Sequence, residues 1–519
     1  MKNYTRREFL QFMSLTPVAL AGLKTNNIHY RPKRKKRPNI LLLMSDNHSW
    51  NHLGCYGDPV VKTPNIDAVA SRGVRFTQAF CAAPSCSPAR AGMLTGQDIW
   101  RLEEGANLWG VLPDKFPCYT DMLEVSGYHV GIQGKGWGPG SVKMSGRGYN
   151  HGGRTYESFD RFLEANNEDK PFCYWLSSPD PHRPFTEGAG VKSDMNLSDV
   201  EIPSYLPDNE TIRRDICDYY YDIEHFDHVV GQLLERLKKA GEYENTVIVI
   251  CSDNGWQMPR GLANLYDSGT RIPLIIAWPG EIPGGRVVDD PVNLNDLAPT
   301  FLELAGEQIP ESMTATSLTK LLFTNQSGKI DPGRDAVYTA RERHALCRQL
   351  GMGYPGRAIR TRDYLYIRNY EPDRWPAGDP PLFGDVDAHM LHYPCPTKMY
   401  MLTHRDNPDV RPLYEKAFLK REAEELYDLN KDPFQMNNCA GQANYQQVRR
   451  QLSQRLDGYL LKTGDPRATG EKVIWDTTMY YQSRDFIAEP GAEAIKKLGL
   501  KKQYNYFDLQ DTLIKKLSK

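Results

Sequence analysis

The chain of 519 residues lacks three features, each of which would point to a particular class of protein. Its 64 Lys and Arg residues are balanced by 65 Asp and Glu residues, so it lacks the basic charge of a nucleic-acid-binding protein. It contains no run of eighteen apolar residues, and we therefore expect no membrane-spanning helix. Ten cysteines are too few in this length for a disulfide scaffold. What is present is an ordinary globular composition, with 25% charged and 11% aromatic residues.

The N-terminus carries two adjacent arginines before a mildly apolar stretch. Arg6 and Arg7 precede residues 12–20, and Ala19-Leu20-Ala21 forms a small-x-small cleavage pattern. This order is typical of a twin-arginine signal, so we expect the export machinery to remove residues 1–21 and deliver a periplasmic or secreted protein. An amphipathic first helix with two solvated arginines is the alternative.

From residue 38 onward the sequence alternates between strand-like and helix-like patterns. A helical spacing of apolar residues over 223–237 is followed by Gly241. The continuous apolar runs of strand length are residues 40–44, 172–176, 246–250 and 274–277. This alternation predicts an α/β fold with a mostly parallel sheet between helical layers. The composition becomes more polar near residue 330, so we expect a main domain over residues 37–330 and a smaller α+β domain over 331–519.

Two of these apolar runs end in the same pair of residue types. Asp46 and Asn47 follow the first run, and Asp253 and Asn254 follow another. Because the carboxyl ends of strands form the ligand crevice of open α/β sheets, we expect the two pairs to face each other. Two carboxylates and two amide oxygens suit Ca²⁺, or Mg²⁺, better than zinc. Turn residues that merely terminate strands are the alternative.

A third motif combines a cysteine, a proline and an arginine with small residues. Cys86 is followed by Pro88 and Arg90, and the segment continues to Leu94-Thr95-Gly96. Pro88 predicts that a helix begins near Cys86, where free backbone amides and the helix dipole favour a nucleophile and an anionic substrate. Arg90 lies one helical turn further and is placed to hold the reactive side chain or the anion.

Together these motifs resemble those of the sulfatase family. Its signature C-x-P-x-R-x-x-x-L-T-G is matched at Cys86, Pro88, Arg90, Leu94, Thr95 and Gly96. The resemblance covers most of residues 37–440, with further matches at residues 37–46, 54–57, 63–67, 134–135, 180–183, 252–255, 265–267, 425–429 and 432–433. Within the family it is greatest to the sulfamidase-like branch, at residues 180–183 and 264–266.

The resemblance implies an alkaline-phosphatase-like fold and a hydrolase that removes sulfate from a sulfated saccharide. A maturation enzyme would oxidise Cys86 to formylglycine, whose hydrated aldehyde attacks sulfur while Arg90 braces the hydrate. Lys135 matches the sulfate-binding lysine of the family, and His182 matches the histidine beside the leaving group, the candidate general acid. The implied metal ligands are Asp46, Asn47, Cys86, Asp253 and Asn254.

The sequence departs from the family pattern at three positions. Trp137 stands where members usually have a histidine, and Leu262 stands where many have a second sulfate-binding lysine. Asn47 replaces a second aspartate, which removes one negative charge from the metal site. We expect Arg260 to compensate for the lost lysine, with an ordinary surface arginine as the alternative. His48 is a weaker candidate to replace the missing histidine.

The C-terminal region contains cations next to aromatic residues. Arg343 and His344, together with Arg374 and Trp375, have the composition of a pocket that binds a sulfated sugar ring through bidentate and stacking contacts. Lys398 is a further candidate for such a sugar-binding pocket. A solvated charged strand beside a buried aromatic residue is the alternative for this region.

The sequence leaves the substrate open between an N-sulfated glucosamine and an O-sulfated algal or glycosaminoglycan saccharide. A phosphate-ester hydrolase of the same superfamily is a further alternative, although the histidine-rich zinc set that would favour it is missing. A non-catalytic protein that binds sulfated glycans is the last alternative, supported only by Trp137 and Leu262.

Overall fold

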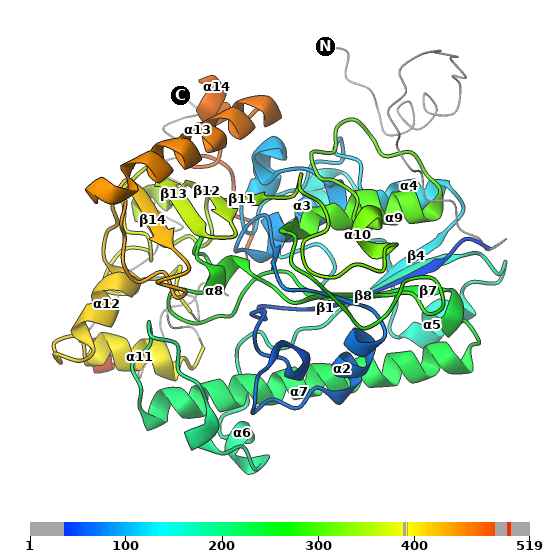
Figure 1. The fold of residues 1–519 in the computed structure, drawn as a ribbon, viewed down its shortest axis with the longest axis horizontal. Coiled ribbons are helices and arrows are strands. Elements are labelled where there is room, and N and C mark those ends of the chain that lie inside the picture. The colour runs from blue at the N-terminus through cyan, green and yellow to red at the C-terminus, as the bar shows by residue number, and fades with distance from the viewer. Residues whose placement is uncertain (1–35, 388–390, 392, 483–495, 500–519) are drawn as a thin grey trace.

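The computed structural model describes residues 36–387, 391, 393–482 and 496–499 (Figure 1). The expected export signal, residues 1–21, lies outside the described residues. Among the helices that are described, none has both the length and the apolarity needed to cross a bilayer.

An eight-stranded sheet runs through the centre of the larger part of the molecule. Its strand order is β5-β4-β6-β1-β7-β8-β2-β9, and β1 pairs in parallel with both β6 and β7. Only β8 runs antiparallel to its neighbours, β7 and β2. The strands are β1 (Asn39–Ser45), β2 (Val74–Phe76), β4 (His129–Gly134), β5 (Arg154–Thr155), β6 (Phe172–Ser177), β7 (Thr246–Ser252), β8 (Leu274–Ala277) and β9 (Arg286–Val288). The prediction of a mostly parallel sheet is confirmed.

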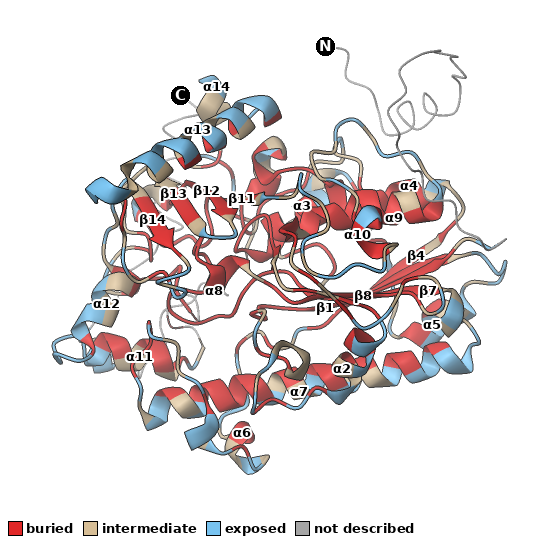
Figure 2. Ribbon diagram, viewed as in Figure 1, coloured by how far each residue is buried: buried red, intermediate tan, exposed pale blue. Residues whose placement is uncertain are grey.

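Helices cover both faces of this sheet, which explains why its strands are continuously apolar (Figures 1 and 2). Leu41 and Leu43 of β1 belong to the core shared with α7, whereas Ile40 and Leu42 belong to the core shared with α3 and α9. The helices of this part are α2 (Pro64–Ser71), α3 (Cys86–Thr95), α4 (Tyr119–Val125), α5 (Phe159–Glu164), α6 (Ala189–Lys192), α7 (Glu210–Lys239), α8 (Asp267–Thr270), α9 (Leu297–Ala305) and α10 (Thr319–Leu322). A short parallel pair joins β3 (Ala79–Phe80) to β10 (Val292–Asn293).

The long helix α7 includes the segment whose spacing predicted a helix. Asn209 caps its N-terminus by accepting hydrogen bonds from the backbone amides of Thr211 and Ile212. The helix ends at Lys239, and Gly241 adopts the left-handed conformation just beyond it, with φ of 72°. Its apolar stripe packs on the sheet while its other face is exposed (Figure 2).

The C-terminal part contains a four-stranded antiparallel sheet, formed by β11 (Ala336–Arg341), β12 (Gly356–Thr361), β13 (Tyr364–Asn369) and β14 (Glu424–Asp428). Its remaining helices are α11 (Pro396–Thr403), α12 (Arg411–Phe418), α13 (Gln446–Thr463) and α14 (Pro466–Thr469). Leu456 of α13 packs with Tyr366 on one face of this sheet, and Leu365 packs with Leu265 on the other. The small sheet therefore lies between α13 and the loop that precedes α8. The division at residues 330 and 331 stays a prediction.

Candidate active site

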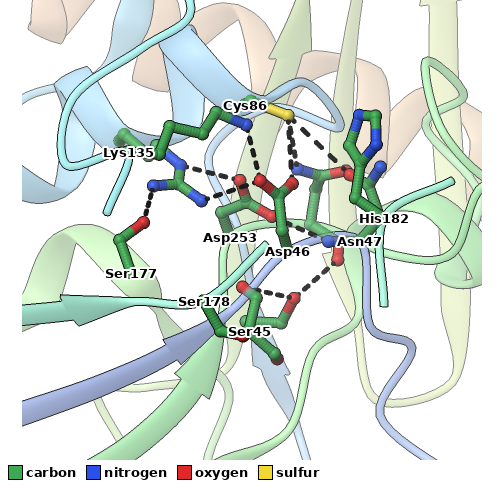
Figure 3. A network of polar contacts seen from close by, with 12 residues as sticks. Ser45, Asp46, Asn47, Cys86, Lys135, Ser177, Ser178, His182 and Asp253 are labelled. Atoms are coloured by element: carbon green, nitrogen blue, oxygen red, sulfur yellow. Dashed lines mark hydrogen bonds and ion pairs between the residues drawn. The ribbon is translucent and has the colours of Figure 1, made fainter. Parts of the chain in front are cut away.

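The two Asp-Asn pairs meet at one edge of the large sheet. The register of β1 and β7 aligns Ser45 with Ser252, so the residues after both strands emerge side by side. The backbone amide of Asn47 donates to Asp253 Oδ1 at 3.1 Å, which ties the two strand ends together. Figure 3 shows the carboxylates of Asp46 and Asp253 close to the sulfur of Cys86.

Cys86 is the first residue of α3, as its motif predicted, and it is only 4% exposed. Its Sγ lies 3.5 Å from Asp46 Oδ1 and 3.8 Å from Asn47 Oδ1. The side-chain amide of Asn254 contacts the same sulfur at 3.8 Å. The reactive position therefore lies at a helix N-terminus and within reach of both strand ends.

Arg90 is fully buried behind Cys86 and holds both carboxylates. Its Nε donates to Asp253 Oδ2 at 2.8 Å, and its Nη2 donates to Asp46 Oδ2 at 3.3 Å. Nη1 donates to the carbonyl of Gly136 and to the hydroxyl of Ser177 at the end of β6. The guanidinium is thus fixed from four sides, and its orientation does not depend on a substrate.

Lys135 follows β4 and pairs with the same carboxylate from the side of the cavity. Its Nζ lies 2.6 Å from Asp46 Oδ2, and 24% of its side chain is exposed. Burial acts to raise the pKa of Asp46, but the charges of Lys135 and Arg90 outweigh burial and hold that pKa well below its usual range. Asp46 is therefore ionised and can only accept hydrogen bonds or bind a cation.

The thiol of Cys86 is not activated by these surroundings. Burial raises the pKa of the Cys86 thiol well above its usual value, and the charge of Asp46 raises it further. Because the thiolate is the nucleophilic form of cysteine, an unmodified Cys86 is a poor nucleophile at neutral pH.

The residues around Cys86 fit a hard divalent cation. Ligand atoms of Asp46, Cys86 and Asp253 lie within 4.8 Å of one another. Asn254 Oδ1 is buried and has no hydrogen-bond partner among the described residues, which is costly unless a ligand binds there. Asn47 donates its Nδ2 to Gln257 at 3.3 Å, so its Oδ1 faces the sulfur. Carboxylate and amide oxygens are the donors that Ca²⁺ and Mg²⁺ prefer.

A cavity of about 630 Å³ opens onto this cluster, and His182 lies in its wall. The Nδ1 of His182 contacts the carbonyl oxygen of Arg183, so Nδ1 carries a hydrogen and Nε2 is left for a ligand. Figure 3 shows His182 on the side of the cluster away from Lys135. Burial lowers the pKa of His182, and the negative charge of Asp46 partly offsets this effect.

Arg183 fixes the loop that carries His182. Its Nη1 and Nη2 donate to both oxygens of Asp215 on α7 at 2.8 and 2.7 Å, and its Nε donates to Asp387. Its backbone amide donates to Gln257 at 3.0 Å. All of these side chains are buried, so this ion-pair network anchors the loop to the long helix and to the C-terminal part.

Two expected substrate-binding residues do not lie in the cavity. Arg260 donates to the carbonyls of Lys416 and Gln435, and its guanidinium stacks on the ring of Tyr266 at 3.9 Å. Arg343 donates to the carbonyls of Thr478 and Met479. Neither residue lines the cavity, and both are almost fully buried. Their guanidiniums bind backbone carbonyls of loops and of the last turn of α12, a requirement that the composition of the segments did not reveal.

His344 does line the cavity, as expected of a substrate-binding residue. Its Nδ1 shares a hydrogen bond of 2.8 Å with the hydroxyl of Ser85, next to Cys86. Burial lowers its pKa to about 4, so His344 is neutral at physiological pH. Leu262 also lines the cavity and brings an apolar side chain there.

The other residues that the sequence singled out lie outside the cavity lining. Trp137 packs in the core against the ring of His151, so it does not take the place of a catalytic histidine. His48 is buried between the hydroxyl of Ser45 and the carbonyl of His52. Arg374 pairs with Asp476, and Lys398 donates to carbonyls of residues 383 and 386.

The residues that line the cavity without having been expected there include Trp109, Asp222 and Tyr393. A sequence signal existed for Asp222, because Asp215, Asp218 and Asp222 recur at three- and four-residue spacing along one face of α7. Acidic residues on a helix face that packs inward indicate polar partners, which the network of Arg183 supplies for Asp215.

Comparisons with known proteins agree with this geometry. The sulfatase family model matches residues 38–307, and the model described as N-sulphoglucosamine sulphohydrolase, C-terminal, matches residues 258–379. An ulvan-active sulfatase of Formosa agariphila is 29% identical, over 83% of this chain and 81% of its own length. The human N-sulphoglucosamine sulphohydrolase is 28% identical, over 83% of this chain and 92% of its own.

Among solved structures, BT4656 in complex with its substrate D-glucosamine-2-N,6-O-disulfate superposes with a TM-score of 0.60. It is 21% identical and covers 84% of this chain and 100% of its own, a likeness that shows the alkaline-phosphatase-like fold. The family model spans more than half of the chain, and its match includes both Asp-Asn strand ends and Cys86. The protein therefore belongs to the sulfatase family.

Proposed function

We propose that this sulfatase releases inorganic sulfate from a sulfated carbohydrate, with residue 86 as the nucleophile after its oxidation to formylglycine. The observation that carries the proposal is the position of Cys86 at the N-terminus of α3, 3.5 Å from Asp46 and beside three further oxygen-bearing side chains. The raised pKa of the thiol supports the need for oxidation, because the unmodified side chain is a poor nucleophile.

Formylglycine would supply the nucleophilic oxygen, and a divalent cation held at the site would polarise the sulfate. We propose Ca²⁺ as the resident ion, with Mg²⁺ as the alternative, held by residue 86 and by Asp46, Asn47, Asp253 and Asn254. These side chains offer only oxygen donors besides position 86, which supports a hard cation. The carboxylates of Asp46 and Asp253 supply oxygen donors of the kind that such an ion prefers.

Three side chains of the chain itself act on the substrate or the nucleophile. Arg90 is held rigidly behind position 86 and orients the nucleophile. Lys135 reaches the cavity and places a positive charge where the sulfate binds. His182 directs Nε2 to the cavity and donates a proton to the leaving oxygen or nitrogen. The bound anion favours the protonated form of His182, which opposes the effect of burial on its pKa.

The reacting group that we propose first is the N-sulfate of a glucosamine. The match of residues 258–379 to the N-sulphoglucosamine sulphohydrolase C-terminal model supports it. An O-sulfate of an algal or glycosaminoglycan saccharide is the second candidate, because an ulvan-active sulfatase is similarly related to this chain. We further propose that a formylglycine-generating enzyme acts on the chain and that the twin-arginine machinery exports it to the periplasm or the medium.

The test is to produce the protein together with a formylglycine-generating enzyme and to examine the peptide that contains residue 86 by mass spectrometry. We expect a mass lower than that of the cysteine peptide, as the aldehyde requires, and release of sulfate from N-sulfated glucosamine. The Cys86→Ala variant is the control and should release none. An unmodified thiol together with no sulfate release from N- or O-sulfated saccharides would contradict the proposal.

A further inference from the structure

Two carboxylates that the proposed chemistry does not use line the same cavity as Cys86. Asp180 follows β6, and its backbone carbonyl accepts a hydrogen bond of 2.8 Å from the amide of Asp46. Its position is thereby fixed relative to the reaction centre. Asp222 reaches the cavity from α7. His225, an exposed residue of the same helix, contacts Asp180 Oδ2 with its Nδ1 at 2.7 Å.

The side chain of Asp222 makes no hydrogen bond or ion pair with any residue that the structure describes. Burial and the nearby charge of Asp180 raise the pKa of Asp222 to about 7. The two carboxylates therefore repel each other, and a further negative charge beside them would be repelled as well. A group that donates hydrogen, such as a hydroxyl or an amine, would relieve this repulsion.

No other described residue of the cavity wall supplies a free positive charge in place of the lysine that many family members have at the position of Leu262. Leu108, Trp109, Leu262 and Tyr393 contribute apolar and aromatic surface. Of the described lining residues with a permanent positive charge, Lys135 is paired with Asp46, and the guanidinium of Arg183 is bound to Asp215 and Asp387. His344 is neutral, because burial lowers its pKa to about 4. The cavity thus has cations where the reacting sulfate binds and acids elsewhere.

From this asymmetry we propose that Asp180 and Asp222 determine substrate specificity. They accept hydrogen bonds from hydroxyl or amino groups of the bound sugar ring, and they disfavour a ring with a second sulfate or a carboxylate. The preferred substrate is then a monosulfated neutral sugar or hexosamine whose single anionic group is the one removed. This proposal rests on the proposed function, since it concerns the ring that the same cavity holds.

The kinetic test compares rings that differ by one sulfate. Glucosamine 2-N-sulfate, glucosamine 6-O-sulfate and glucosamine 2-N,6-O-disulfate are assayed at about pH 8, where Asp222 is ionised. We expect kcat/KM for the better monosulfate to exceed that for the disulfate by about ten-fold or more, since like charges in a binding site are strongly unfavourable. In the Asp222→Asn variant the ratio should fall to about three or less.

The matched control is Glu210→Gln, which removes one negative charge from an exposed position on the same helix. It should leave the ratio within about two-fold of the wild type, because exposed charges far from the cavity are screened. A wild-type enzyme that cleaves the disulfate as well as the monosulfate would overturn the proposal. An unchanged ratio in Asp222→Asn would overturn it too.

A binding measurement separates this proposal from the proposed function. If the wild type releases no sulfate from any saccharide, the proposed function fails. Calorimetry with the Cys86→Ser variant then tests the role of Asp180 and Asp222 in binding directly. We expect this variant to bind the monosulfates more tightly than the disulfate, and substitution of Asp222 by Asn to remove the difference. Equal or tighter binding of the disulfate would overturn the proposed role of Asp180 and Asp222 in specificity.

Discussion

Asp46 and Asp253 each contact a buried or half-buried cation, so the cluster around Cys86 is close to neutral as it stands. Asp46 pairs with Lys135 and Arg90, and Asp253 pairs with Arg90. A divalent cation would add two positive charges to this neutral cluster, and the sulfate ester or sulfamate of the substrate, which carries one negative charge, would balance one of them. The charges of these side chains therefore favour binding of the metal ion together with the anionic substrate.

The buried side-chain oxygen of Asn254, which has no hydrogen-bond partner among the described residues, leads to a prediction about metal binding. Asn254→Leu replaces a buried, unsatisfied amide oxygen with an apolar group of similar shape, which should stabilise the metal-free protein by about 1–3 kcal/mol. The same change removes a proposed metal ligand, so the rise in thermal unfolding midpoint on adding Ca²⁺ should be lost. Thermal unfolding with Ca²⁺ or Mg²⁺, and with a chelator, measures both effects.

Asn295→Leu is the matched control for this experiment. Asn295 Oδ1 is also buried and without a hydrogen-bond partner, but it does not line the cavity. This variant should keep the full stabilisation by Ca²⁺. Retained stabilisation in Asn254→Leu would show that Asn254 is not a ligand.

At the scale of elements, the loop between β6 and α6 depends on one buried arginine. Arg183 binds Asp215 with two nitrogens and Asp387 with a third, and His182 immediately precedes it. A lysine presents a single ammonium and cannot reproduce this fork. Because one of the two buried carboxylates would lose its charge-assisted bond to residue 183, although Asp215 keeps its hydrogen bonds from Thr397, Arg183→Lys should cost about 1–3 kcal/mol of stability.

The same variant should impair proton donation by His182 more than substrate binding. We expect Arg183→Lys to lower kcat for a saccharide sulfate by about 10- to 100-fold, part of the usual contribution of a general acid, with a small change in KM. An aryl sulfate with a good leaving group needs little protonation, so its kcat should fall much less. Arg213→Lys is the control, because Arg213 also binds one aspartate with two nitrogens but lies at the surface. Equal losses for both substrates would argue against a positioning role.

The strands were largely predictable from the sequence, because a continuous apolar run indicates a strand that is buried on both faces of its sheet. All four predicted strands exist, and the motif of Cys86 correctly predicted the start of α3. The reversed direction of β8 was not predictable, since periodicity carries no information on strand direction. The orientations of Arg260 and Arg343 were not predictable either, because they depend on carbonyls far away in the sequence.

At the scale of the whole molecule, the interior contains histidines that cannot accept a proton without cost. His52 is 5% exposed and is surrounded by the rings of Tyr219, Tyr220 and Trp256. Burial lowers its pKa from 6.5 to about 3. In the unfolded chain His52 takes up a proton below about pH 6.5, whereas in the folded protein it stays neutral. The contribution of His52 to stability is therefore present above this pH and is lost as the pH falls toward 3.

His52→Asn tests this account of acid sensitivity. Asn keeps a hydrogen-bonding nitrogen near the position of Nδ1, which contacts the hydroxyl of Tyr219 at 3.2 Å. Between about pH 7 and pH 5, His52 should contribute about 2 kcal/mol to the loss of stability. The fall in thermal unfolding midpoint over this range should be smaller in His52→Asn, and unchanged in His228→Asn, at an exposed position of α7. An identical fall in His52→Asn and wild type would contradict the prediction.

The complete burial of α3 has a consequence for the timing of maturation. Every residue of α3 is buried, so an enzyme that oxidises Cys86 must meet the segment before the chain folds around it. Ser252 ends β7, whose pairing with β1 closes the site, and it follows Cys86 by 166 residues (252 − 86). At synthesis rates of about 5–20 residues per second, roughly 8–33 s separate the two on the ribosome. Under the proposed maturation, oxidation of Cys86 has to be completed during translation, and slower translation through residues 87–252 should raise the oxidised fraction.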